Sequence, residues 1–182
     1  TPPDIVRFAT GYGAWVLANI PTDHSSNVSA KPIVVIGRDA RLSGAMVSDL
    51  VAATLNSLGI DVIDLGLSTT PTVELAVPEL NADGGIILTA SHNPKQWNAL
   101  KLLDHNGEFL SAAEGEKMLM LSDSVVDYAE VDHLGETTHD ETWIDWHIQH
   151  VLNLDLVSAE AIRSAGLKIA VDAVNSSGGI SI

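Results

Sequence analysis

The sequence GGIILTASHNPKQWNALKLL, residues 84–103, sets a polar segment between two apolar ones. Residues 84–90 have the unbroken apolar composition of a strand that is covered on both faces. Residues 99–105 return to an apolar pattern, which predicts another strand. The segment TASHNP between them is too short to hold a crossover helix, so the second strand is expected to run antiparallel to the first.

The chain before this stretch alternates strand and helix patterns. Two further apolar runs, PIVVIG at residues 32–37 and IDVIDLG at residues 60–66, predict strands. Helices are expected at residues 1–20, 43–58, 71–80 and from 111 onward. This alternation predicts an α/β fold, namely a three-layer α/β/α domain with a mixed four-stranded sheet whose fourth strand is antiparallel.

Helical spacing also predicts which helix residues face the core. The helix at residues 43–58 can be capped by the Ser43 hydroxyl. Its expected inner residues are Met46, Leu50, Val51, Ala53, Thr54 and Leu58. A later helix at residues 142–152 is expected to pack through Trp143, Trp146, Ile148 and Leu152.

The remaining sequence indicates a domain boundary. Residues 122–140 are acidic and lack a clear period, which is typical of a connector. A short helix is expected at residues 158–165, and LKIAVDAVNSSGG at residues 167–179 predicts a new strand and turn that resemble PIVVIGRD. We therefore predict one domain with its connector over residues 1–157 and the start of a second, similar domain over residues 158–182.

Composition restricts the partners. The formal net charge is −15, from 24 acidic and nine basic residues, and an acidic field of this size repels nucleic acid and anionic membranes. No apolar run is long enough to cross a bilayer. The absence of cysteine excludes thiolate catalysis and disulfides and fits a cytoplasmic location.

Two polar loops are expected to meet at one edge of the sheet. GRDARLSG, residues 37–44, follows one strand, and TASHNPKQWN, residues 89–98, follows another. In open α/β sheets ligands bind at the carboxyl ends of strands. Four cations, Arg38, Arg41, Lys95 and Lys101, would then surround the Ser91 hydroxyl, as an anionic phosphate or carboxylate ligand requires.

The hexapeptide TASHNP, with a downstream Asn and Lys, resembles the phosphoserine loop of the α-D-phosphohexomutase superfamily. GRDARLSG is similar to a segment of the family's first domain, and TTPTVELAV, residues 69–77, to its next helix start. The resemblance covers nearly the whole chain. It implies an N-terminal fragment of an intramolecular phosphotransferase of the phosphoglucomutase and phosphomannomutase type, with phosphoglucosamine mutase as an alternative.

The resemblance also implies residue roles. Ser91 would carry the phosphoryl group and supply one Mg²⁺ ligand, and His92 and Lys101 would act as general acid and base toward a hexose phosphate substrate. Arg38 and Arg41 would bind the phosphoryl group. Asn93 and Asn98 would hold the loop.

Two departures from the family pattern limit these implications. Ala99 stands where the family usually has Gly, and its Cβ is expected to affect the turn. The family's Asp-Gly-Asp metal loop, sugar-binding loop and final phosphate-binding domain are missing from this sequence. We therefore expect the remaining domains of a longer parent chain to be required for activity.

Three other interpretations remain at this point. Ser91 and His92 would be the nucleophile and base of a serine hydrolase, although neighbouring side chains on an extended loop point in different directions. His139, His147 and His150 would form a metal site, for which a His-x-x-His pair is a weak signal. The chain would otherwise be a non-catalytic sugar-phosphate-binding domain.

Overall fold

The structure is a computed structural model that describes residues 1–20 and 31–182. Its main helices are α1 (Pro2–Ala18), α2 (Gly44–Ser57), α3 (Thr70–Glu79), α4 (Ala112–Ser122), α5 (Trp143–Leu152) and α6 (Ala159–Ser164). Its strands are β1 (Ile33–Arg38), β2 (Asp61–Leu67), β3 (Gly84–Leu88), β4 (Leu100–Leu103) and β5 (Thr137–His139). Single 3-10 turns occur at Val131–His133 and Ser177–Gly179.

The strands form one mixed sheet in the order β4-β3-β1-β2-β5. β1 pairs in parallel with β2 and β3, and β4 runs antiparallel to β3, as the short TASHNP connection predicts. The prediction of four strands is wrong by one. β5 lies in the segment that we expected to be a connector, and it pairs in parallel with β2.

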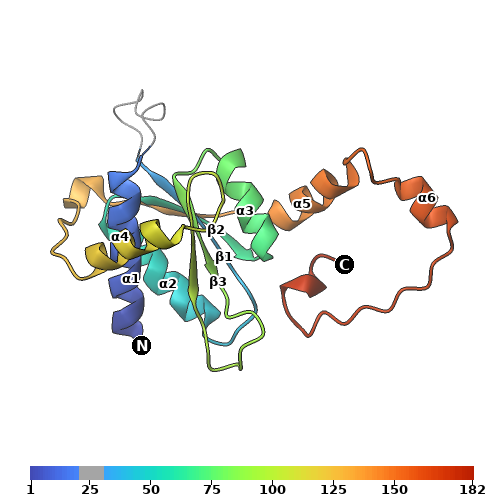
Figure 1. Ribbon diagram of the computed structural model, residues 1–182, viewed down its shortest axis with the longest axis horizontal. Helices are drawn as coiled ribbons and strands as arrows, with labels where there is room; N and C mark the ends of the chain where they lie inside the picture. The colour runs from blue at the N-terminus through green and yellow to red at the C-terminus, as the bar shows by residue number, and fades with distance from the viewer. Residues whose placement is uncertain (21–30) are drawn as a thin grey trace.

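Helices cover both faces of the sheet, which confirms the three-layer α/β/α class. α1, α2 and α4 pack with Val34 and Ile36 on one face, and α3 and α5 pack with Val35 on the other. Figure 1 shows α1, α2 and α4 together on one side and α3 on the opposite side. Alternate residues of β1 therefore belong to different cores, because successive side chains of a strand point to opposite faces.

The inner face of α2 differs from the prediction. Val47 and Leu55 are buried, whereas Met46 is 46% exposed. Ser43 is the N-cap residue, but its side chain makes no capping hydrogen bond. Apolar residues occur around most of this helix, so helical spacing alone does not select the side that meets the sheet.

The buried residues of α5 also agree only in part with the prediction. Trp143 is buried as predicted, together with Ile144, which the prediction omitted. Leu152 is 42% exposed. The helix packs against α3, where His147 is hydrogen bonded to Thr72, and its far end lies beyond the edge of the core.

Tyr12 of α1 fixes the start of the β3–β4 hairpin. Its buried hydroxyl lies 2.7 Å from the carbonyl oxygen of Leu103 and 3.1 Å from that of Gly85. Burial raises the pKa of the Tyr12 phenol well above its ordinary value, so the hydroxyl keeps its proton. A Cβ at position 84 would lie only 2.2 Å from this hydroxyl oxygen, which explains glycine at the start of β3.

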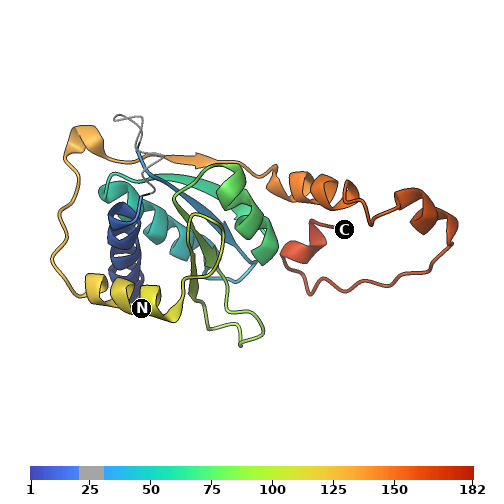
Figure 2. The same ribbon diagram turned by 45° about the horizontal axis from the view of Figure 1, so that its top comes forward.

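The strand predicted at the start of LKIAVDAVNSSGG is not formed. Residues 167–174 have no strand pairing, and Leu167, Ile169 and Val171 are 66%, 74% and 59% exposed. A strand needs a neighbour for its main-chain groups, and no described strand lies beside this segment. Figures 1 and 2 both show α6 away from the layers. The chain returns further along, where the Ala40 amide lies 3.5 Å from the Ser176 hydroxyl oxygen. The proposed second domain stays a prediction.

Candidate active site

Two loops meet at the carboxyl edge of the parallel strands, as predicted. β1 ends at Arg38 and β3 at Leu88, and these two residues are paired across the sheet. The Asp39 amide donates to the carbonyl oxygen of Leu88 at 3.1 Å, so the GRDARLSG loop leaves the sheet beside the TASHNP loop. The central position of β1 between β2 and β3 is what brings the loops together.

The TASHNP loop is closed by its own main chain. The Thr89 amide donates to the Ala99 carbonyl oxygen at 3.2 Å, and the Asn93 amide donates to that of Ala90 at 2.9 Å. Ser91 lies at the exposed tip with φ = 52°, in the left-handed region that residues with a side chain rarely adopt. The Ser91 side chain is exposed, so its hydroxyl faces outward from the sheet edge rather than into the core.

Arg41 binds the loop rather than standing free beside it. Its Nη1 donates to the carbonyl oxygens of Pro94 and Trp97 at 3.0 and 2.9 Å. Its Nη2 donates to those of Ser91 and Asn93 at 2.7 and 3.0 Å. The guanidinium thus contacts four main-chain carbonyls spread over residues 91–97 of the loop.

Asp39 links Arg41 to Thr89. Its carboxylate accepts Arg41 Nε at 3.0 Å and the Thr89 hydroxyl at 2.7 Å. The Thr89 Oγ1 accepts the Ser91 amide at 3.1 Å. The side chains of Asp39 and Arg41 are only 18% and 11% exposed, so this ion pair is shielded more than an ordinary surface pair.

Ser91 and His92 are neighbours in space as well as in sequence. The Ser91 Oγ and His92 Nδ1 atoms lie 3.4 Å apart, and both side chains are exposed. No hydrogen bond from another described side chain orients the His92 ring. A serine hydrolase triad needs such a third group, so the geometry does not favour that interpretation.

The other predicted site residues differ in the contacts that they make with the TASHNP loop. Among the described residues the Arg38 guanidinium has one hydrogen bond, at 3.3 Å to the Asp39 carbonyl oxygen. Asn98 holds the loop with its side chain, which donates to Ser43 Oγ at 3.2 Å and accepts the Ala99 amide at 3.0 Å. Asn93 contributes only main-chain groups.

Lys101 is not brought to Ser91. It lies in β4 opposite Ile87, and its ammonium is 5.7 Å from the centre of the Phe109 ring. Lys95 is exposed on the loop. Ala99 has no positive φ, so its Cβ fits the turn without strain at that position.

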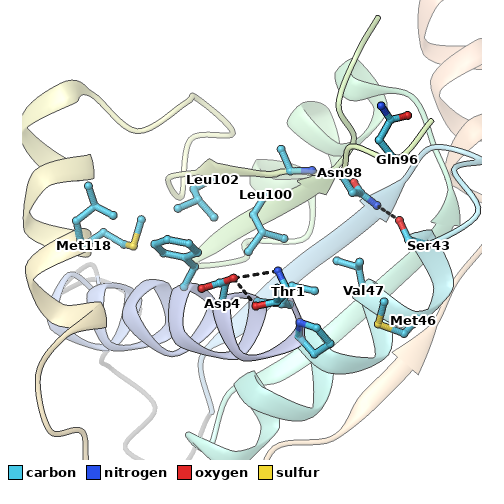
Figure 3. A pocket seen from close by; sticks show the side chains of 15 residues that line it. Thr1, Asp4, Ser43, Met46, Val47, Gln96, Asn98, Leu100, Leu102 and Met118 are labelled. Carbon is cyan, nitrogen blue, oxygen red and sulfur yellow. Dashed lines mark hydrogen bonds and ion pairs between the residues drawn. The ribbon is translucent and has the colours of Figure 1, made fainter. Parts of the chain in front are cut away.

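An apolar cavity of about 550 Å³ lies beside the loop, between α1, α2, α4 and β4. Figure 3 shows Leu100, Leu102 and Met118 lining it and the Asn98 side chain pointing to Ser43 at its rim. Neither Ser91 nor any of the four cations lines this cavity. An anionic ligand is therefore expected at the exposed edge and not in the cavity.

The three C-terminal histidines do not form a site. His139 lies 3.6 Å from Asp64, His147 is hydrogen bonded to Thr72 at 2.9 Å, and His150 stacks on Trp146. Within residues 1–20 and 31–182, no group of three metal-ligating side chains occurs. The same part of the chain has no helix long and apolar enough to cross a membrane.

Sequence reasoning missed Asp39 and Thr89. Both lie within the two motifs that it singled out, one residue after β1 and one after β3. An acidic residue in a predicted anion site was a usable signal, because it would weaken anion binding unless paired with a cation. Their contact depends on strand order, which the motifs do not state.

The fold and the site define a class: an α/β/α domain that presents an exposed serine on a loop bound by an arginine. The sequence profile described as "Phosphoglucomutase/phosphomannomutase, alpha/beta/alpha domain I" matches residues 5–123. The chain therefore belongs to the phosphoglucomutase/phosphomannomutase family through this domain. This confirms the resemblance seen in TASHNP and GRDARLSG.

The similar proteins carry names from the same family. A phosphoglucomutase/phosphomannomutase of Thermococcus kodakarensis is 37% identical over 155 residues, which are 84% of this chain and 33% of the relative. A phosphoglucosamine mutase of Leuconostoc mesenteroides is 35% identical over 86% of this chain and 34% of its own length. The chain spans about a third of the curated relatives it matches.

A solved structure shows the same fold. A phosphoglucomutase/phosphomannomutase family protein of Burkholderia thailandensis superposes with a TM-score of 0.64 over 84% of this chain and 32% of its own. Its identity to this chain is 20%, so the likeness concerns the fold alone.

Proposed function

We propose that this chain is the phosphoserine-bearing part of a phosphohexomutase, which interconverts hexose 1-phosphate and hexose 6-phosphate. The observation that supports it most is the placement of Ser91 at the exposed tip of a loop that is bound by Arg41 and leaves the sheet next to the end of β1 at Arg38. A phosphoryl group on Ser91 would bring about −1.5 to −2 charge, which these cations would offset. Family membership supports the same reaction class.

The proposed chemistry is phosphoryl transfer in both directions. A sugar hydroxyl oxygen forms a bond to the phosphorus as the bond to Ser91 Oγ breaks, and the hydroxyl proton passes to a base. The resulting hexose bisphosphate returns its other phosphoryl group to Ser91. The proposed base is His92, and the 3.4 Å distance from its Nδ1 to Ser91 Oγ supports that role.

Lys101 takes part in this proposal only as the family resemblance implies. In the structure its ammonium lies near the Phe109 ring. Lys101 belongs to the edge strand β4, and its side chain would have to turn away from the Phe109 ring for the ammonium to reach a bound sugar.

The described residues fit Mg²⁺ only in part. A phosphoserine oxygen on Ser91 is one hard oxygen ligand of the kind that Mg²⁺ prefers, but the ion takes about six. The described part of the chain has no cluster of three ligating side chains. Aspartates elsewhere in the parent chain would supply the others, and the ion would neutralise charge on the phosphoryl group when bound.

The substrate and setting follow from the same proposal. We favour glucose or mannose phosphate, with glucosamine phosphate as the alternative. The relatives include both phosphoglucomutase/phosphomannomutases and phosphoglucosamine mutases, so they agree with either substrate. The proposed location is the cytoplasm, where sugar phosphates are made and used. Partners are the remaining domains of the parent chain, and the isolated 182 residues are expected to be inactive.

Intact mass tests the proposal against a purely sugar-phosphate-binding domain. The parent chain, expressed and purified without phosphatase, should contain a fraction heavier by one phosphoryl group, mapped to Ser91 by peptide sequencing. Ser91→Ala should remove it, whereas Ser124→Ala, on the exposed surface after α4, should not. Unmodified wild-type protein, also after incubation with a hexose bisphosphate, would favour the binding domain.

A further inference from the structure

We propose that Asp39 and Arg41 are positioning residues that hold Ser91 in its reactive place, and that Arg41 does not bind the substrate phosphate. We call the Asp39–Arg41 ion pair, together with its hydrogen bonds to Thr89 and to the four loop carbonyls, the Asp39–Arg41 brace. This inference rests on the proposed role of Ser91, and it revises the expectation that Arg41 is a phosphate ligand.

The first argument is the donor count of Arg41. A guanidinium has five N–H donors: one on Nε and two on each terminal nitrogen. Nε is bonded to Asp39, and each terminal nitrogen is bonded to two loop carbonyls. No donor is left for a phosphate oxygen unless a bond to the loop breaks. Arg38, with a single hydrogen bond at 3.3 Å among residues 1–20 and 31–182, is the arginine of the GRDARLSG loop that keeps unused donors in that part of the chain.

The second argument is that the brace binds both main-chain groups of Ser91. The Ser91 carbonyl oxygen accepts directly from Arg41 Nη2. The Ser91 amide donates to Thr89 Oγ1, whose own hydrogen is given to the Asp39 carboxylate. Asp39 also accepts the main-chain amide of Arg41, which fixes the turn of its own loop.

The third argument is that Ser91 needs such support. At φ = 52° its main chain occupies a region that is costly for residues with a Cβ, and such conformations persist where surrounding contacts impose them. The direction of the Ser91 hydroxyl depends on that φ. Since phosphoryl transfer depends on alignment, a displacement of about 1 Å can reduce the rate about 100-fold.

Hydrogen–deuterium exchange on the 182-residue chain tests the brace without any enzyme activity. The five loop amides with partners belong to Thr89, Ser91, Asn93, Trp97 and Ala99. Arg41→Ala and Arg41→Lys should both speed exchange in residues 89–99 and leave β1 and β2 protected. A lysine keeps the charge but offers one nitrogen, so it cannot bridge four carbonyls.

The matched control is Arg7, an arginine that pairs with a single carboxylate, Asp123, on the surface. Arg7→Ala and Arg7→Lys should leave exchange in residues 89–99 at the wild-type rate. Exchange of the loop in Arg41→Lys that equals the wild type would overturn the brace.

Thr89 gives a second test that leaves every charge in place. Thr89→Val keeps the shape and removes the hydroxyl between Asp39 and the Ser91 amide, so exchange at Ser91 should rise. Thr89→Ser restores the hydroxyl and should restore protection. This pair still decides the question if the Arg41 variants fail to fold, and equal protection in Thr89→Val and wild type would count against the brace.

Kinetics of the parent chain separate positioning from phosphate binding. With a hexose 1-phosphate, both Arg41 variants should lose kcat by about 100-fold with KM unchanged. A loss confined to KM, or recovery in Arg41→Lys, would make Arg41 a phosphate ligand. A wild-type parent chain without mutase activity would refute the proposed function, and the exchange results would still decide the brace.

Discussion

Two segments with similar sequences differ in structure: one forms a buried strand, and the other forms no strand and is exposed. PIVVIGRD includes the central strand β1, in which Val34, Val35 and Ile36 are fully buried between helix layers. LKIAVDAV has the same apolar pattern, yet it forms no strand and leaves Ile169 74% exposed. The difference lies in the partners: β1 has a strand on each side, and residues 167–174 have none among the described strands. Strand propensity becomes a strand only where main-chain groups find neighbours.

The largest expected effect compares the two segments directly. Ile36→Ala removes a fully buried side chain between β2, β3 and the α1–α2 layer, and should lower the free energy of unfolding by about 2–5 kcal/mol. Ile169→Ala should change it by less than about 0.5 kcal/mol, as exposed substitutions do. Urea denaturation measures both. Similar losses would show that residues 167–174 are packed in solution.

A smaller loss of unfolding free energy is expected from a change at the β3–β4 hairpin, which carries Ser91. Tyr12→Phe leaves two buried carbonyl oxygens without their hydroxyl partner and should cost about 1–3 kcal/mol. The other tyrosine, Tyr128, is 58% exposed, and Tyr128→Phe should be nearly neutral. Thermal unfolding of the two variants side by side tests this, and equal midpoints would mean that the Tyr12 hydroxyl does not support the hairpin.

The smallest expected effect on the free energy of unfolding concerns Asp140, which lies between β5 and α5. Hydrogen bonds from Thr142, through its hydroxyl and its amide, and from the Trp143 indole keep the pKa of Asp140 below its ordinary value. A lowered folded pKa means stability that is present above the unfolded pKa, near 3.9, and is lost as pH falls through the folded pKa. Asp140→Asn should cost about 1 kcal/mol at neutral pH.

The pH dependence itself is the measurement for Asp140. The gap in unfolding free energy between wild type and Asp140→Asn should stay constant from neutral pH down to about pH 5 and narrow below about pH 4. Asp155→Asn, on the exposed surface after α5, is the matched control. A gap that is independent of pH would assign the effect to shape and not to charge.

Much of the fold was predictable because its signals are local. Unbroken apolar runs and helical spacing located β1, β2, β3 and their helices, and the short TASHNP connection gave the antiparallel β4. β5 was not predictable, because Thr137–His139 carries no apolar pattern and becomes a strand only by pairing with β2. The buried face of α2 was likewise decided by the sheet beneath it.

The candidate site was also predictable only in part. The TASHNP and GRDARLSG motifs marked Ser91 and Arg38, and the strand pattern predicted that the two loops meet. The motifs did not distinguish Arg38 from Arg41, since both are cations in one loop. Only the contacts show that Arg41 uses its donors on the TASHNP loop.

By itself, then, the sequence determined the layers, the direction of the hairpin, the family and the serine at the tip, because each depends on residues close together in the chain. The tertiary structure decided the fifth strand, the fate of residues 167–174 and the partners of Arg41, since each requires groups that lie far apart in sequence to meet in space.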